Sequence, residues 1–376
     1  MSPRIAALVV TAVFVASSPL ADRIVSHASA AQSAAPHVTL TPALPIGLPG
    51  EVDSNSPAVW DTVDGQPTLF VITSFAGQPS VASGPSVSRL GEPTAISFSS
   101  PRPYGTWMEA IVADDAGTWY GYYHSEEPAN VCGRPDRFVA SIGAARSSDH
   151  GHTWDDLGII LAADPSSVAC DSTNRYVIGG VGDVSVMLGP DKTDLYLFFS
   201  QYEKDPAVQG VAVGRLLWAA RDHPIGRVSV WNDGTWLHGR LQRTPTISPD
   251  GTSHRVWFDY PEGTPLVPTT EAWHDGDDVV NAFWGPSVHW NEYLQQYVML
   301  LNRAKDEEYD EEGIYVSFAP RLDDPSLWSM PEKIISGGRW YPQVLGLGGD
   351  GTDKLSGATA RLFMSGRSEW AISFTR

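Results

Sequence analysis

One pattern of short strands and turns repeats along most of the chain. From Pro57 onward, short runs rich in Val, Ile, Tyr, Phe and Trp alternate between apolar and polar positions, and Gly, Asp, Asn or Pro separates the runs. Alternation with a period of two indicates β-strands with one buried face. No convincing run with helical periodicity appears, so the sequence predicts an all-β protein.

The strands fall into five successive units. The second unit, for example, contains WMEAIVAD, GTWYGYYHSE, FVASIGAARSS and TWDDLGIIL, whereas the fifth is one strand short. Four-stranded units repeated in sequence are typical of β-propellers. We therefore predict a five-bladed β-propeller over residues 46–376 as a single domain, with the missing strand supplied by the segment before Pro57. The irregular stretch from Leu237 to Asn281 is interpreted as a long loop over one face.

The beginning of the chain has the features of a targeting segment. Arg4 precedes an apolar run that ends at Ala16, and the small residues Ala28 and Ala30 flank a cleavage site. The run is too short to span a bilayer. We predict a signal peptide over residues 1–30, a disordered lead-in over 31–45, and a secreted or periplasmic protein with no membrane segment in its mature form. Earlier cleavage, or retention of the run as an anchor, is the alternative.

Charge and cysteine content limit the partners. The net charge of −19 repels nucleic acid and anionic membranes, so the expected ligand is an uncharged oligo- or polysaccharide. We expect the protein to be a monomer. Cys132 and Cys170 both lie in the exported part, where a structural disulfide is favoured. No cofactor or catalytic metal is expected. The acidic run 305–313 is interpreted as a solvated turn, with a structural calcium site as the alternative.

The stretch SSDHGHTW first suggests an acid–base cluster. It matches S-x-D-x-G-x-T-W, and so resembles the Asp-box of sialidases and other β-propellers. An Asp there accepts backbone N–H bonds in a tight hairpin, and the Trp packs beneath the turn. Asp149 and Trp154 are therefore predicted to be structural, and His150 and His152, at the variable positions, are expected to be exposed.

The predicted catalytic residues open the innermost strands, which a propeller gathers around a central funnel. Three of these openings carry a carboxylate: Asp53, Glu109 and Asp183. Convergent acids suit glycosidic hydrolysis, in which one protonates the leaving oxygen and another acts as base or nucleophile. We assign Asp183 as base or nucleophile, Glu109 as acid and Asp53 as the supporting carboxylate. The alternative for Asp53 is a turn cap before Ser56.

The arrangement resembles the five-bladed propeller glycoside hydrolases of the arabinanase, xylosidase and invertase group. VDSNSPAVW is similar to their first-blade Asp motif, and GDVSVML with DLYLFFS is similar to their Asp-x-Ser-Val strand pair. FWGPSVHWNEYLQQYVMLLN resembles secreted propellers that include endo-D-arabinanases. The resemblance implies an exported hydrolase acting on a neutral or furanosidic sugar. The order Asp, Glu, Asp departs from the Asp, Asp, Glu of arabinanases.

Further polar and aromatic residues near the strand ends are candidates for substrate binding. Tryptophans that precede inner strands stack sugar rings in such proteins, although the core also uses them. The predicted substrate-binding residues are Asn55, Trp107, His124, Arg175, Trp284, His289, Arg303 and Trp340.

Two other functions remain open. A non-catalytic carbohydrate-binding propeller keeps the aromatic residues and does not need paired acids. A sialidase-like exo-glycosidase needs converging arginines for the substrate carboxylate. The arginines available for such a cluster are Arg175, Arg303, Arg339 and Arg367.

Overall fold

Antiparallel strands make up almost all of the regular structure, which confirms the all-β class. The computed structural model describes residues 35–100, 102, 104–162, 168–245, 254–269 and 281–376. Residues 36–376 form one compact unit. The predicted signal peptide over 1–30 lies outside the described residues. No helix in the described part of the chain is long and apolar enough to cross a membrane.

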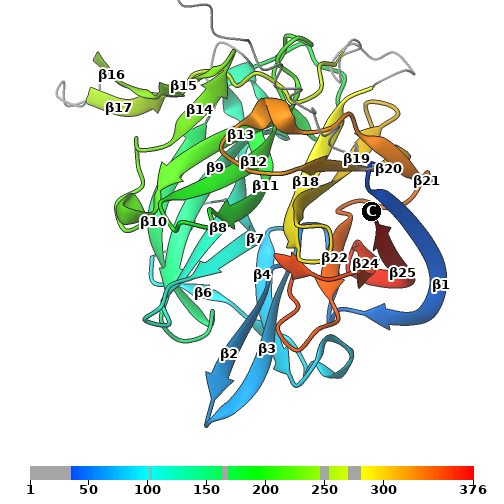
Figure 1. The fold of residues 1–376 in the computed structure, drawn as a ribbon. Helices are drawn as coiled ribbons and strands as arrows, with labels where there is room; N and C mark the ends of the chain where they lie inside the picture. Colours follow the sequence, from blue (N-terminus) through cyan, green and yellow to red (C-terminus); the bar gives the residue numbers. More distant parts are fainter. Residues whose placement is uncertain (1–34, 101, 103, 163–167, 246–253, 270–280) are drawn as a thin grey trace, which may run out of the picture. The chain divides into compact units, whose positions relative to one another are not determined.

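Within the described ranges, most strands fall into five antiparallel sets of four, called here the first to fifth sheets, and a parallel pairing also joins the second set to the third (Figure 1). The first sheet contains β2 (Ala58–Val63), β3 (Gln66–Phe75), β4 (Gln78–Gly84) and β5 (Thr94–Ala95). The second contains β7 (Gly105–Ala113), β8 (Trp119–Ala129), β9 (Arg134–Ser147) and β10 (Thr153–Ala162). The third contains β11 (Val177–Leu188), β12 (Asp194–Gln201), β13 (Gly210–Leu217) and β14 (Ser229–Asn232).

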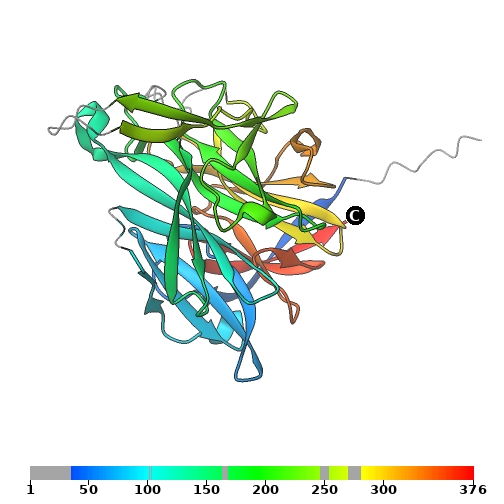
Figure 2. The same ribbon diagram turned by 90° about the vertical axis from the view of Figure 1, so that its left-hand side faces the viewer.

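The fourth and fifth sheets complete the series. The fourth contains β18 (Phe283–Asn291), β19 (Gln296–Ala304), β20 (Glu311–Ala319) and β21 (Glu332–Ser336). The fifth contains β22 (Gln343–Gly346), β24 (Thr359–Met364), β25 (Arg367–Thr375) and β1 (His37–Gly47). The first and second sheets, blue to teal, lie side by side in both views (Figures 1 and 2).

The N-terminal strand β1 completes the fifth sheet, as the sequence predicts. It pairs with β25 from His37 opposite Thr375 to Gly47 opposite Arg367 (Figure 1). The predicted disorder over 31–45 is therefore wrong from residue 37 onward, and residues 31–34 lie outside the described part. The backbone groups along the edge of β25 supply the hydrogen-bond partners that order this segment.

The long loop predicted from Leu237 to Asn281 is also partly wrong. It contains the end of β15 (Thr235–His238) and a hairpin of β16 (Arg240–Pro245) and β17 (His254–Asp259). The pairing runs from Arg240 opposite Asp259 to Pro245 opposite His254. Each of these strands is only six residues long, and so short a run carries too weak an alternation to be recognised alone.

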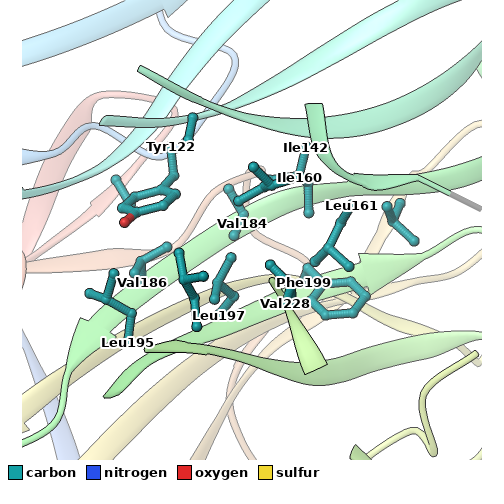
Figure 3. Close-up of a cluster of buried hydrophobic side chains, with 14 of the residues drawn as sticks. Tyr122, Ile142, Ile160, Leu161, Val184, Val186, Leu195, Leu197, Phe199 and Val228 are labelled. Carbon is teal, nitrogen blue, oxygen red and sulfur yellow. The ribbon is translucent and has the colours of Figure 1, made fainter. Parts of the chain in front are cut away.

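The apolar core lies between neighbouring sheets. Figure 3 shows the cluster between the second and third sheets, with Tyr122 and Ile142 facing Val184, Leu197 and Phe199. Similar clusters join the first sheet to the second, the third to the fourth, the fourth to the fifth, and the fifth to the first. Each sheet is thus buried on two faces, which explains its continuous apolar runs.

Side-chain hydrogen bonds also tie the first strand of a sheet to the neighbouring sheet. Ser74 Oγ accepts the backbone N–H of Met108 at 3.0 Å, and Ser185 Oγ accepts that of Val288 at 3.0 Å. The fifth and first sheets are joined by Gln343, whose Oε1 accepts the Ser56 N–H at 2.6 Å and whose Nε2 donates to the Ser56 carbonyl at 2.8 Å. The last sheet is therefore bonded directly to the first.

The SSDHGHTW stretch forms the turn between β9 and β10. Asp149 Oδ1 accepts the Ser147 hydroxyl at 2.8 Å and the Thr153 N–H at 2.9 Å, and the buried Trp154 donates to the Gly151 carbonyl at 2.8 Å. His152 is exposed, as expected.

The expectation that His150 is exposed is wrong. The His150 side chain is half-buried and stacks on Phe70 of the first sheet, with ring centroids 5.0 Å apart. Its Nδ1 lies 3.1 Å from Asp61 Oδ2. The turn between β9 and β10 packs against the neighbouring sheet, a contact that the local motif does not encode.

We predict that Gln343→Ala destabilises the protein by about 2–4 kcal/mol, because it leaves the buried N–H and carbonyl of Ser56 without partners. Urea unfolding followed by circular dichroism measures the change. Gln66→Ala, at an exposed turn position, is the control and should change stability by less than about 0.5 kcal/mol. Equal effects of the two substitutions would contradict the linking role of Gln343.

Candidate active site

A pocket of about 210 Å³ is lined by residues from all five sheets or the segments beside them. All three carboxylates that the sequence predicts as catalytic line it: Asp53 before β2, Glu109 on β7 and Asp183 on β11. The other lining residues are Trp107, His124, Glu126, Tyr176, Val177, Tyr202, Trp284, Tyr309, Trp340 and Tyr341.

Irregularities in the first strands coincide with these positions. The register of β7 shifts between Met108 and Ala110, and that of β11 shifts between Gly182 and Ser185. An extra residue in one strand bends it and re-aims a side chain, as occurs beside many active sites. Glu109 lies within the first shift and Asp183 within the second. The bulges thus account for two strand acids in the pocket lining.

The Gly-rich approach to Asp183 reflects close backbone packing. Gly180 has φ +99°, and a Cβ there would collide with the carbonyl of Ala140 on β9. A Cβ on Gly182 would lie 2.6 Å from the ring of His124. Asp183 itself has φ +44°, which is a strained conformation for a residue with a side chain. The glycines allow β11 to press against β9 and His124.

Asp53 lies at the more open side of the pocket and accepts two N–H groups. Trp107 Nε1–H donates to Oδ1 at 2.7 Å, and the Ala76 N–H donates to Oδ2 at 3.0 Å. Burial nevertheless raises the pKa of Asp53 above its usual value, against the effect of these bonds. Both donors favour the ionised carboxylate and fix its orientation.

Glu109 is almost fully buried and has the properties of a protonated acid. Its Oε2 accepts the N–H of Val184 at 2.5 Å, which also links β7 to β11. Burial, and after it the charge of Asp183, raises the pKa of Glu109 well above its usual value. A raised pKa keeps the proton on a carboxyl group to higher pH, and the protonated carboxyl is the form that donates to a leaving group.

Asp183 is held by its neighbours on two sides. The Tyr202 hydroxyl donates to Oδ2. His124 Nδ1 lies 3.4 Å from Oδ1 and accepts the backbone N–H of Asp183 at 3.1 Å. His124 Nε2 lies 3.5 Å from Glu126 Oε1. Burial opposes a charged imidazole, but hydrogen bonding to Asp183 and Glu126 outweighs it and raises the pKa of His124 well above its usual value.

Glu109, His124 and Asp183 also satisfy the spacing of a metal site. One ligand atom from each lies within 4.8 Å of the others. In the present arrangement protein groups already bond to them: Val184 to Glu109, Tyr202 to Asp183, and the Asp183 N–H to the imidazole. These contacts suit proton exchange among the three groups.

Aromatic rings form the part of the pocket contributed by the third to fifth sheets. Trp284 lies at the centre of this wall, with ring centroids 5.0 Å from Tyr309, 5.5 Å from Tyr341 and 5.8 Å from Trp340. The contacts are edge-to-face, which fixes each ring. A rigid, largely apolar wall facing polar groups is suited to binding a sugar ring.

Four of the predicted substrate-binding residues line the pocket: Trp107, His124, Trp284 and Trp340. The other four do not line it. Asn55 is buried and donates to the Pro286 carbonyl at 3.0 Å. Arg175 is exposed and pairs with Glu308 at 3.1 Å.

Arg303 and His289 serve the packing of the fourth sheet. Arg303 Nη1 donates to the Tyr315 hydroxyl at 3.1 Å. His289 is fully buried beside Phe374, and burial with the nearby charge of Lys354 lowers the pKa of His289 to about 3. Sequence alternation places His289 among core positions, and the structure has it there.

The tyrosines of the pocket were missed by sequence reasoning. Tyr176 precedes β11, Tyr202 follows β12, and Tyr341 precedes β22 with φ +57°. The stretch 305–313, predicted to be only a solvated turn, contributes the buried Tyr309 to the aromatic wall. An aromatic residue just before an inner strand is a signal that reaches Tyr176 and Tyr341, whereas Tyr202, after the second strand of its sheet, and Tyr309 carry no comparable signal.

The predicted disulfide between Cys132 and Cys170 is present, with Cα atoms 5.2 Å apart. It joins the segment after β8 to the segment before β11, near the side of the pocket that carries Tyr176 and Val177. Arg134 adds a bond to the Ser172 carbonyl at 2.6 Å.

No protein-family model and no curated protein matches the chain. Solved structures similar to it include an endo-arabinase from Bacteroides thetaiotaomicron, with 10% identity, a TM-score of 0.49, and 88% of this chain and 97% of that chain covered. An α-L-arabinanase from Penicillium chrysogenum complexed with arabinobiose has 11% identity and a TM-score of 0.46, covering 88% and 85%. An α-L-arabinofuranosidase from Lactobacillus brevis has 12% identity and a TM-score of 0.43, covering 84% and 89%.

These similar structures belong to the kind of hydrolase that the sequence motifs resemble. Because identities and TM-scores are low, we infer the chemistry from the pocket itself.

We predict that Glu109→Gln flattens the dependence of stability on pH. The raised pKa of Glu109 means that the folded protein binds this proton more tightly than the unfolded chain, so wild-type stability falls as pH rises above about 4.5, by up to about 1.4 kcal/mol per pH unit. The amide keeps an acceptor for Val184 and does not titrate. Urea unfolding at several pH values tests this, with the exposed Glu92→Gln as control. Parallel curves for wild type and Glu109→Gln would contradict it.

Proposed function

We propose that this chain is an exported, monomeric glycoside hydrolase that acts on a neutral or furanosidic oligo- or polysaccharide. We also propose that its fold is a single-domain five-bladed β-propeller. The observation that carries the proposal is the convergence of Asp53, Glu109 and Asp183, from three successive sheets, in one pocket with an aromatic wall. The five sheets and the bonds between the fifth and first sheets support the propeller. The acidic net charge and the leader sequence support an uncharged substrate and export.

The roles of the acids follow from their surroundings. Glu109 is the proton donor, because burial and the adjacent Asp183 keep its carboxyl protonated. Asp53 is the base or nucleophile, because two N–H donors orient it and it is the least buried of the three. The charge of Asp183 helps to raise the pKa of Glu109. This exchanges the roles of Asp53 and Asp183 relative to the sequence assignment, since Asp183 is enclosed by Tyr202 and His124.

A sialidase-like activity is disfavoured. The described residues that line the pocket include neither arginine nor lysine, and a substrate carboxylate beside Asp53, Glu109, Glu126 and Asp183 would be repelled. A non-catalytic sugar-binding role would not explain why buried carboxyl groups, which cost free energy, are held together. Hydrolysis uses both the acids and the aromatic wall.

Activity should be tested on arabinan, xylan, fructan and sialosides. We expect product from a neutral polysaccharide, and a loss of about 100-fold or more in kcat/KM for Asp53→Asn and Glu109→Gln. Asp136→Asn, at an exposed position, is the control. If the wild type releases no product, and the wild type and the variants all bind sugar in affinity electrophoresis, the chain is a sugar-binding protein instead.

We also predict a bell-shaped pH profile for kcat/KM, displaced upward from that of free carboxyl groups. The acid limb follows Asp53, which must be ionised and whose pKa is raised by burial. The alkaline limb follows Glu109, which must be protonated and whose pKa is raised further. Initial rates between pH 3 and 10 measure both limbs. A profile that is already falling above about pH 4.5 would exclude Glu109 as the donor.

A further inference from the structure

His124 is the only basic side chain among the described residues that line the pocket, and it lies between two carboxylates. Its Nδ1 faces Asp183 Oδ1 at 3.4 Å, and its Nε2 faces Glu126 Oε1 at 3.5 Å. Both Asp183 Oδ1 and His124 Nε2 are buried and have no closer hydrogen-bond partner. A neutral imidazole can donate to only one of the two carboxylates, and its Nε2–H tautomer keeps the bond from the Asp183 N–H to Nδ1. An imidazolium donates to both carboxylates and gives up that bond.

The backbone of β11 is shaped to hold this imidazole. The positive φ of Asp183 accompanies a backbone N–H that points at His124 Nδ1, at 3.1 Å, so that Asp183 presents both a donor and an acceptor to one ring nitrogen. Gly182 packs against the ring with no room for a side chain. Trp107 covers the ring at a centroid distance of 5.5 Å. The ring therefore keeps its position whether Nδ1 accepts from the N–H or donates to Oδ1.

The groups around His124 are mostly acidic. Glu109 on β7, Asp183 on β11 and Glu126 on β8 contribute carboxyl groups, and Asp53 lies beyond them. The neutral hydroxyls of Tyr202, Tyr309 and Tyr341 complete the pocket, with the pKa of Tyr341 raised well above its usual value by burial and the nearby acids. A positive charge at His124 favours the ionised form of the acids beside it, Glu109 included.

We propose that His124, oriented by Glu126, is a positioning residue that keeps Asp183 ionised and in place, so that the proton of the Glu109–Asp183 pair stays on Glu109, the donor. The catalytic consequence rests on the proposed function, but the charge and orientation of His124 do not. Neither residue needs to touch the substrate.

The first test is an NMR titration of the histidine ring signals in the folded protein, with His124→Gln to assign the His124 signal. We expect His124 to remain protonated above pH 7. Glu126→Gln should lower the His124 midpoint by about one pH unit or more. The matched control is Glu127→Gln, at the next, exposed position of β8, which should not move it. A neutral His124 at pH 7, or equal effects of the two variants, would overturn the proposal.

The second test is the rate profile on whichever polysaccharide is hydrolysed. Glu126→Gln and His124→Gln should lower kcat by about 10- to 100-fold with KM changed less than about twofold. His124→Gln should also move the alkaline limb upward, because the imidazolium lowers the pKa of Glu109. If His124 has a purely structural role, His124→Gln should lower stability without shifting the alkaline limb of the pH profile. Without any hydrolysis the proposed function fails, while the NMR test still decides the state of His124.

Discussion

The hydrogen bonds that join the first strand of a sheet to the neighbouring sheet are the constraint on which the rest of the structure depends. Each sheet packs its apolar faces against two neighbours, but apolar packing alone is not directional. The bonds from Ser74 to Met108, from Glu109 to Val184 and from Gln343 to Ser56 set the register between sheets. Because the fifth sheet is also bonded to the first, the five sheets hold the pocket residues in fixed positions relative to one another.

Glu109 shows that the link between sheets and the chemistry use the same side chain. Its carboxyl group accepts the Val184 N–H and therefore ties β7 to β11, and it also faces the pocket. Burying this group beside Asp183 raises its pKa, so the protonated state follows from the position that the link imposes. A structural amide at this position would make the same bond but would have no proton to donate.

The sequence predicts those parts of the fold and site that local patterns encode. Alternation identified the strands, and the openings of the inner strands led to Asp53, Glu109 and Asp183, which lie together. The burial of His150 against Phe70 depends on a partner distant in sequence, which no local pattern contains. The β16–β17 hairpin was missed because its six-residue strands carry too weak an alternation. Residue type alone also failed for Arg175 and Arg303, because an arginine near a strand end equally serves pairing at the surface or within a sheet.

The location of strain in β11 supports a functional rather than a merely structural reading of the pocket. A strand that only had to pack would not need a left-handed aspartate, three glycines in its approach and a shifted register. Such conformations persist only where the surroundings enforce them. Here the enforced result is that one residue, Asp183, offers its N–H and its carboxylate to the same imidazole while Tyr202 holds the other oxygen. The strain is thus concentrated at the residue whose charge state controls Glu109.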